Sequence, residues 1–222
     1  MNKQSLAALL TLTALLPASA AIYSSGNVNG GGTSLNLAIP DGNPNGIFTT
    51  IAVSGAGSFL TDVNVTLNIS GGYNGDLYGY LSYNGTLVTL LNRVGTGVGD
   101  TFGYSASGFS NVTLDDASGN GNIHNVANPL ANTAYTPDIG GNNLASFNGG
   151  NPNGTWTLFF ADLSGGDVST LNGWSLDITA VPEPVNVALL VAGGLLGLLS
   201  LGRWWLKGRA SGLMKLKRDI ST

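Results

Sequence analysis

The chain has 222 residues, of which 43% are hydrophobic, only 9% are charged, 34 are Gly and none is Cys. The lack of Cys excludes disulfides, thiol catalysis and Cys-based zinc sites, and the single His excludes a His-rich metal site. Between residues 21 and 180 the charged side chains are ten Asp and one Arg, for a net charge of −9. So acidic a body repels phosphate backbones, and we expect no nucleic acid among its partners.

Residues 1–20 have the three parts of a secretory signal peptide. Lys3 supplies the positive start, an apolar run extends from Leu6 to Leu16, and Ala18-Ser19-Ala20 is a small-residue cleavage site. The alternative is an uncleaved anchor helix, but the apolar run is short for a bilayer span and ends at Pro17. We expect cleavage at this site and an exported protein.

The body between the two ends is expected to be all-β. Apolar and polar residues alternate with period two, as in Val63–Ile69, and no stretch of the body shows a sustained period of 3.6. We predict N-terminal strands and a linker over 21–60 and an antiparallel β-sandwich over 61–180. Thr155–Ala161 is almost continuously apolar, which predicts a central strand. The expected strands are Phe48–Val53, Val63–Ile69, Leu77–Tyr83, Leu87–Leu91, Asn111–Leu114, Thr155–Ala161 and Trp174–Ile178.

Asn-Gly pairs predict the turns, because both residues tolerate a positive φ. The four pairs are Asn74-Gly75, Asn84-Gly85, Asn153-Gly154 and Asn172-Gly173. A Gly-Asn-Pro-Asn-Gly stretch occurs at 42–46 and again at 150–154. It marks either a duplicated unit or a turn used twice, and the unmatched flanks favour the second reading.

Several motifs follow one another between residues 61 and 178. They are Gly75-Asp76-Leu77, Leu81-Ser82, Gly85-Thr86, Asp115-Asp116, Gly154-Thr155-Trp156-Thr157-Leu158, Asp162, Gly166-Asp167, Leu171-Asn172 and Trp174-Ser175-Leu176. In this order they resemble the P domain (P/Homo B domain) that follows the protease in kexin- and furin-like convertases. The resemblance implies a jelly-roll-like sandwich. Tyr83 stands where the family usually has Pro, and with no protease sequence ahead of the module we expect no convertase activity.

Two kinds of enzyme site were weighed against the residues. His124 is the only base for a Ser-His-Asp system, but it lies in a Gly/Asn-rich loop and no Gly-x-Ser-x-Gly elbow exists, so we interpret it as a solvated loop residue. A glycosidase would need two carboxylates, both from Asp, and ten scattered Asp form chance pairs easily. We therefore predict a protein that is not an enzyme, with a small secreted Asp-dependent hydrolase as the alternative.

Four Asp residues at strand ends are the candidate metal ligands: Asp115, Asp116, Asp162 and Asp167. Carboxylates and backbone carbonyls beside Gly suit Ca²⁺, and the P-domain resemblance implies calcium in some members. The competing reading is that Asp caps turns by accepting backbone N–H bonds. Ca²⁺ is the one cofactor we consider.

Tyrosines gather around the Gly-Asp-Leu motif, at Tyr73, Tyr78, Tyr80 and Tyr83. Tyr78 and Tyr80 fall on one face of the expected strand and Tyr83 on the other. An aromatic platform for sugar rings is one reading and ordinary sandwich packing is the other, which we favour.

The C-terminal end, 181–222, has the features of a sorting tail. Pro182-Glu183-Pro184 precedes an apolar run from Val185 to Leu201, and we expect a transmembrane helix over about 185–206. Arg203, Lys207 and Arg209 then act as the basic stop-transfer signal that stays cytoplasmic. This order resembles a PEP-CTERM signal, which implies recognition by an exosortase in a Gram-negative bacterium. The basic end runs on to Thr222, longer than is usual for that family.

These features together predict an exported, surface- or matrix-associated binding or structural protein of the cell envelope. The inner membrane would hold it through the C-terminal helix before processing. Expected partners are the membrane, the exosortase, and an extracellular polysaccharide or another surface protein. A permanently anchored single-pass protein is the remaining alternative.

Overall fold

The computed structural model describes residues 18–29, 32–98, 100–138, 141–182 and 192–200. Residues 18–181 form one compact unit, and 1–17 with 182–222 form another. Most of the expected signal peptide lies outside the described residues, as do Glu183, Pro184 and the basic residues Arg203, Lys207 and Arg209.

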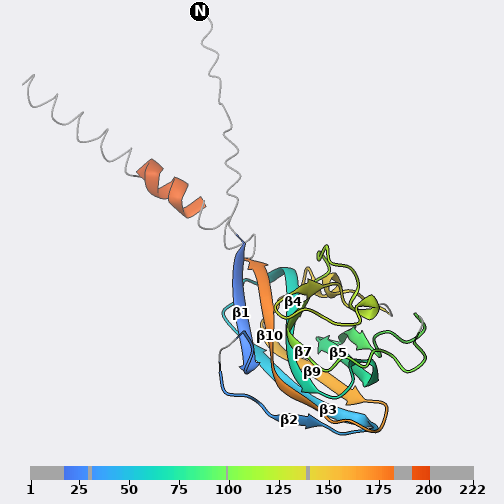
Figure 1. Ribbon diagram of the computed structural model, residues 1–222. Coiled ribbons are helices and arrows are strands. Elements are labelled where there is room, and N and C mark those ends of the chain that lie inside the picture. Colours follow the sequence, from blue (N-terminus) through green and yellow to red (C-terminus); the bar gives the residue numbers. More distant parts are fainter. Residues whose placement is uncertain (1–17, 30–31, 99, 139–140, 183–191, 201–222) are drawn as a thin grey trace, which may run out of the picture. The chain divides into compact units, whose positions relative to one another are not determined.

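The first unit is all-β and has two sheets (Figure 1). The larger sheet runs in the order β1 (Ser19–Gly26), β10 (Ser169–Val181), β4 (Phe59–Gly71), β7 (Phe109–Leu114) and β8 (Ala134–Tyr135), and β2 (Leu37–Ile39) also pairs with β10. The smaller sheet runs in the order β3 (Asn43–Val53), β9 (Gly154–Asp162), β5 (Leu77–Tyr83) and β6 (Thr86–Asn92). β9 is therefore an interior strand, as its apolar sequence predicted.

All strand pairs are antiparallel except one. β8 pairs with β7 in parallel, at Thr113↔Ala134 and Leu114↔Tyr135. The predicted antiparallel pairing is therefore confirmed for the other pairs of named strands, and the structure departs from the prediction at this edge. The long connection from β7 to β8, which passes through the 3₁₀ turn η2 (Ile123–Asn125), carries the chain back to run in the same direction.

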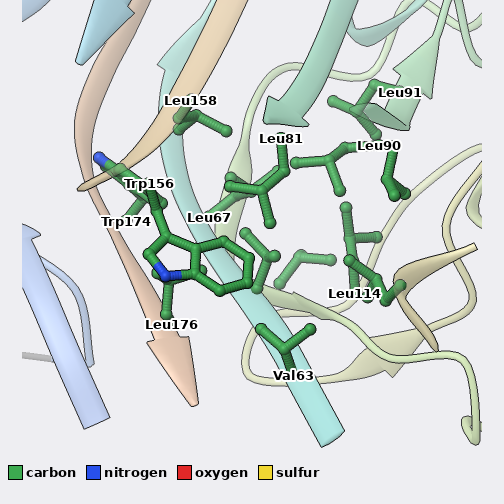
Figure 2. Close-up of a cluster of buried hydrophobic side chains, with 14 of the residues drawn as sticks. Val63, Leu67, Leu81, Leu90, Leu91, Leu114, Trp156, Leu158, Trp174 and Leu176 are labelled. Carbon is green, nitrogen blue, oxygen red and sulfur yellow. The ribbon is translucent and has the colours of Figure 1, made fainter. Parts of the chain in front are cut away.

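The core lies between the two sheets. Alternate residues of β4, from Val63 to Ile69, are buried and face the smaller sheet. Figure 2 shows Leu67, Trp174 and Leu176 of the larger sheet beside Trp156 and Leu158 of the smaller one. Burial of one face of each sheet accounts for the period-two pattern, and it leaves two outward faces.

All seven expected strands are present, and β5 has the predicted bounds. N-terminal strands were predicted within 21–60, but bounds were given there only for Phe48–Val53; β1 and β2 were not individually predicted, and β8 was missed. β1 is rich in Ser and Ala and begins inside the expected signal-peptide region, while β2 and β8 have only three and two residues. Two 3₁₀ turns besides η2 were also missed, η1 (Asn74–Asp76) and η3 (Leu144–Phe147).

One of the four Asn-Gly predictions holds as a tight turn. Asn84 and Gly85 join β5 to β6 with φ of 47° and 80°. Asn74-Gly75 instead begins η1, Gly154 is the first residue of β9, and Asn172-Gly173 forms a bulge inside β10. Gly173 is required at the bulge, because a Cβ there would lie 2.5 Å from the backbone O of Asn27.

The repeated Gly-Asn-Pro-Asn-Gly stretch is one turn used twice. The Oδ1 of Asn43 accepts from the N–H of Asn45 at 3.0 Å, and the Oδ1 of Asn151 accepts from the N–H of Asn153 at 2.9 Å. The first copy forms the irregular start of β3, and the second leads into β9, which pairs with β3. The same short-range Asx hydrogen bond explains the shared sequence, since it needs Asn two residues before the bonded amide.

The described part of the tail is short. Residues 192–200 form a helix whose leucines Leu195, Leu196, Leu198 and Leu199 are exposed. Among the described residues, no helix has both the length and the apolar character that a bilayer crossing requires. The expected span over about 185–206 extends past the described residues at both ends.

Candidate functional site

The outward face of the smaller sheet carries a row of aromatic side chains. Phe48 of β3 pairs with Phe159 of β9, and Phe159 pairs with Tyr80 of β5. Tyr78 lies two residues from Tyr80 and points the same way, because Leu77, Gly79 and Leu81 face the core. We call Phe48, Tyr78, Tyr80 and Phe159 the aromatic face.

The rings of the aromatic face are partly ordered against one another. Tyr80 stacks on Phe159 with centroids 4.8 Å apart and planes at 18°, and Tyr78 meets Tyr80 edge-on at 6.2 Å. Phe48 is 75% exposed and makes no ring contact with any described residue. The sheet therefore holds two rings of the row in place and leaves the third open to a ligand.

Gly46 leaves room for this arrangement. A Cβ at Gly46 would lie 2.8 Å from Cζ of Phe159, and its backbone has φ of 52°. The ladder between β3 and β9 is irregular here, between Asn43 and Ile47. A side chain at this position would first meet the carbonyl oxygen of Phe160, which lies nearer to such a Cβ, and after it the Phe159 ring.

A second row on the same face is made of hydroxyl groups. Thr50 pairs with Thr157, and Thr157 pairs with Ser82, across the same three strands. This row lies two residues along each strand from the aromatic row, about 7 Å away at the strand rise. The remaining outward positions are uncharged as well: Ala52, Thr155, Ala161, Leu87 and Thr89.

The prediction that the four tyrosines serve sandwich packing is confirmed for Tyr83 alone, since Tyr73 is 47% exposed. Tyr83 packs inside the sandwich, stacked on Trp156 at 4.1 Å, and its hydroxyl donates to the carbonyls of Asn151 and Asn153. Tyr78 and Tyr80 lie on the outward face, away from the core. The sequence analysis did not single out Phe48 and Phe159. Both stand at outward positions of strands whose core-facing positions are mostly apolar, which is the signal that could have found them.

The structure does not bring the four candidate calcium ligands together. Register places Leu114 beside Val65 of β4 and Ser169 beside Gly71, six residues on, or about 20 Å along the strand. Asp115 and Asp116 directly follow Leu114, near Val65. Asp162 and Asp167 precede Ser169, near Gly71, at the end of β4. Within the described ranges, no group of three or more His, Asp or Glu could hold a metal ion.

Asp115 and Asp116 both cap turns. One oxygen of Asp115 accepts from the N–H of Ala117 at 2.7 Å. Asp116 accepts from Leu144 and Ala145 at the start of η3, at 3.2 and 2.7 Å. The turn-capping reading accounts for these two residues.

Asp162 forms a buried acidic pair with Asp76. The two residues are 0% and 7% exposed, and Oδ2 of Asp162 has no hydrogen-bond partner. Burial raises the pKa of Asp162, and the charges of Asp41 and Asp167 raise it further. Hydrogen bonds from the N–H groups of Ser164 and Gly42 act in the opposite direction but do not cancel the rise. Burial and then the charge of Asp162 raise the pKa of Asp76. Both shifts favour the neutral carboxyl.

His124 is not the solvated loop residue that the sequence predicted. Its side chain is 17% exposed, Nδ1 lies 2.9 Å from Oδ2 of Asp138, and Nε2 lies 2.9 Å from the carbonyl of Thr96. Both partners are acceptors, so the ring bonds both of them only as the imidazolium. Burial lowers the pKa of His124, but its hydrogen bonds to Asp138 and Thr96 and the Asp138 charge outweigh burial and raise it.

This geometry bears on the Ser-His-Asp reading. A catalytic base must have one ring nitrogen within reach of the nucleophile's proton. In His124 one nitrogen meets a carboxylate and the other a backbone carbonyl. The residue holds the 93–96 loop against the loop of Asp138, since Gly95 also donates to the carbonyl of His124 at 2.9 Å.

A cleft of about 370 Å³ lies beside Asp116 and Asp138, with Thr136, Asn142 and Asn143 also in its lining. Asp138 accepts from the N–H of Asn92 at 2.8 Å as well as bonding His124. Asp116 and Asp138 are the two carboxyls in the lining, but the Asp138 side chain is only 1% exposed and both oxygens of Asp116 accept from η3 amides. The cleft is therefore the place where the hydrolase alternative is tested, and its two carboxyls have structural partners.

Comparisons with known proteins leave the chain without a family. No protein-family model and no curated protein matches it. The similar solved structures include a serine protease of Aeromonas sobria in complex with its chaperone (TM-score 0.46, 15% identity) and the same protease alone (TM-score 0.44, 16% identity). The likeness covers 76% and 75% of this chain but 28% of each protease chain, and it is too weak to carry fold or function.

Proposed function

We propose that this protein is an exported, non-enzymatic binding protein of the Gram-negative cell surface or matrix. The signal peptide over 1–20 exports it, and the body folds as a jelly-roll-like, P-domain-like sandwich. The tail over 181–222 acts as a PEP-CTERM-like signal, with a transmembrane helix over about 185–206 that holds the chain in the inner membrane. An exosortase then removes the tail near Pro182-Glu183-Pro184.

The pairing of the first and last strands carries this proposal. Ser19 pairs with Ala180 and Ala20 with Thr179, so the chain enters and leaves the body at one end of the larger sheet. Cleavage after Ala20 removes two of the eight residues of β1, and a cut near Pro182 falls just past the end of β10. The signal peptide and the C-terminal tail can therefore both be removed without breaking the core.

The environment of His124 supports a role without catalysis. Its two ring nitrogens are held by Asp138 and by the carbonyl of Thr96, which gives the residue a structural task. Asp115 and Asp116 likewise have capping tasks. Binding and display remain as the functions that the body serves.

Intact-mass measurement of the exported protein tests the proposal. We expect an N-terminus at Ala21 and a C-terminus at Pro182–Pro184 in the envelope or medium. Pro182→Ala combined with Pro184→Ala should leave the chain ending at Thr222 in the membrane fraction. Thr222 retained in the unaltered protein would establish the permanent anchor instead, and Met1 retained in the cytoplasm would overturn the proposal.

The cleft beside Asp116 and Asp138 provides the test of the hydrolase alternative. We expect the exported protein to release no reducing sugar from cellulose, chitin or alginate above the level of buffer. Release that Asp138→Asn abolishes would replace the proposal by an Asp-dependent hydrolase.

A further inference from the structure

We infer that the aromatic face binds an uncharged polysaccharide. This inference rests on the proposed function, because only an exported domain meets such polymers outside the cell. The ligand-contacting residues are Phe48, Phe159 and Tyr80, with the hydroxyl row of Thr50, Thr157 and Ser82 beside them.

The exposure of Phe48 is the first argument. A side chain 75% exposed in mid-strand contributes almost nothing to the core, and its partner across the ladder is another outward aromatic ring. An exposed ring of this size in mid-strand is apolar surface that water does not favour. Such a surface on a rigid sheet suits a partner that meets it ring against ring.

The shape of the face matches an extended sugar chain. Three aromatic positions on adjacent strands span about 10 Å, two strand spacings, which is comparable with the length of a few linked pyranose rings. The faces of aromatic rings are negative, and they attract the C–H groups that cover the flat side of a pyranose. The open ring of Phe48 provides this contact. Phe159 and Tyr80 each have one face stacked on the other ring, so they offer a ligand their remaining faces and edges.

The hydroxyl row gives the second half of the match. A sugar ring is apolar on its faces and carries hydroxyls around its rim, so a binding surface needs hydrogen-bonding groups beside its stacking groups. Thr50, Thr157 and Ser82 supply them in register with the aromatic row. An apolar protein partner would leave this row without a use.

The charge of the body favours a neutral polysaccharide over an anionic one. None of the outward positions in the four strands is charged, while the body between 21 and 180 has a net charge of −9. That field repels anionic polysaccharides, and the face offers no cation to offset it. The one arginine of the body, Arg93, bonds the carbonyl of Gly75 beyond the edge of the aromatic face.

Binding is measured with the exported protein. Affinity electrophoresis in gels that contain hydroxyethylcellulose, and co-sedimentation with cellulose and with chitin, supply the neutral probes. Alginate supplies the anionic one. We expect retention on at least one neutral polymer, insensitive to salt, and weakened at least tenfold by Phe48→Ala and by Tyr80→Ala.

Ile22→Ala is the matched control. Ile22 is an exposed apolar residue, 66% accessible, that pairs with Asp177 on the outward face of the other sheet. This variant should bind as the unaltered protein does. Cooperative thermal unfolding of all three variants, well above the temperature of the binding assay, would show that the losses at Phe48 and Tyr80 are local.

Several outcomes would overturn the inference. They are no retention on any neutral polymer, retention that Phe48→Ala and Tyr80→Ala leave unchanged, or retention by alginate alone. A dimer in analytical ultracentrifugation that Phe48→Ala dissociates would assign the face to a second copy of the chain. A protein that is exported and loses its tail but binds no polymer disproves this inference alone, whereas a protein that stays in the cytoplasm disproves the proposed function.

Discussion

The two outward faces of the sandwich differ in chemistry although the same alternation builds both. The smaller sheet presents the aromatic face, whereas the larger sheet presents Asp62, Asn64 and Asp177 in a polar patch. There Asn64 donates to Asp62 at 3.1 Å, and the hydroxyls of Thr66 and Thr113 bond each other at 2.9 Å. A surface of polar and charged side chains suits solvent, and a surface of open rings suits a ligand.

The polar patch of the larger sheet also contains groups that lower the stability of the fold. Oδ1 of Asn64 and Oδ1 of Asp177 are buried without a hydrogen-bond partner. Burial and the charges of Asp115, Asp177 and Asp116 raise the pKa of Asp62, against its hydrogen bond from Asn64. Repulsion among these carboxylates therefore destabilises the outward face of the larger sheet. The aromatic face has no charged side chain and so has no such repulsion.

The largest expected loss of stability comes from a substitution in the core between the two outward faces. Trp156 is fully buried, donates from Nε1 to the carbonyl of Pro152 at 2.9 Å, and stacks on Tyr83. Trp156→Ala should lower the free energy of unfolding by about 3–5 kcal/mol, since it removes a large ring from a packed site. Phe48→Ala, by contrast, should change it by less than about 0.5 kcal/mol.

Urea unfolding of the two variants measures this difference. Similar losses for Trp156→Ala and Phe48→Ala would show that Phe48 belongs to the core. The aromatic face would then lose its open ring.

The loop around His124 should matter for stability but not for either face. The folded-state pKa of His124 lies above its ordinary value of 6.5, so the stabilisation is fully present below pH 6.5 and is lost as the pH rises through the folded pKa. His124→Ala should cost about 1–3 kcal/mol near pH 5.5 and less at alkaline pH. Thermal unfolding against pH gives the profile, and a cost that does not vary with pH would contradict the imidazolium assignment.

The stacked pair tests whether the aromatic face is pre-ordered. A double-mutant cycle with Tyr80→Ala and Phe159→Ala should give a coupling energy of about 0.5–1.5 kcal/mol, the range for stacked rings. The same cycle with Tyr80→Ala and Phe48→Ala should give almost none, because their rings do not touch. Equal coupling in both cycles would mean that all three rings are packed together.

The smallest effect is expected at the larger sheet. The folded-state pKa of Asp62 is raised above 3.8, so the native state holds its proton more tightly and stability falls as the pH rises from that value through the folded pKa. Asp62→Asn should remove this fall, with a gain below about 0.5 kcal/mol near neutral pH because exposure screens the charge. A loss of stability in Asp62→Asn would show that the carboxylate is a favourable part of the patch.

The sequence by itself determined the strands whose pattern is local. Burial of one face imposes period two within a single segment, so strands such as β5 could be read directly, and Asn84-Gly85 could be placed because both residues must adopt positive φ. Asn172-Gly173 has the same chemistry but forms a bulge, since the backbone of Asn27 approaches it there. No local rule contains that approach.

The candidate site was decided by tertiary structure. Tyr78 and Tyr80 could be placed on one face of one strand, but only the register of three strands brings Phe48, Tyr80 and Phe159 into a row. His124 acquires its charge from Thr96 and Asp138, which are remote in the chain. Register and proton affinity both depend on neighbours supplied by packing, and a linear pattern does not specify which neighbours those are.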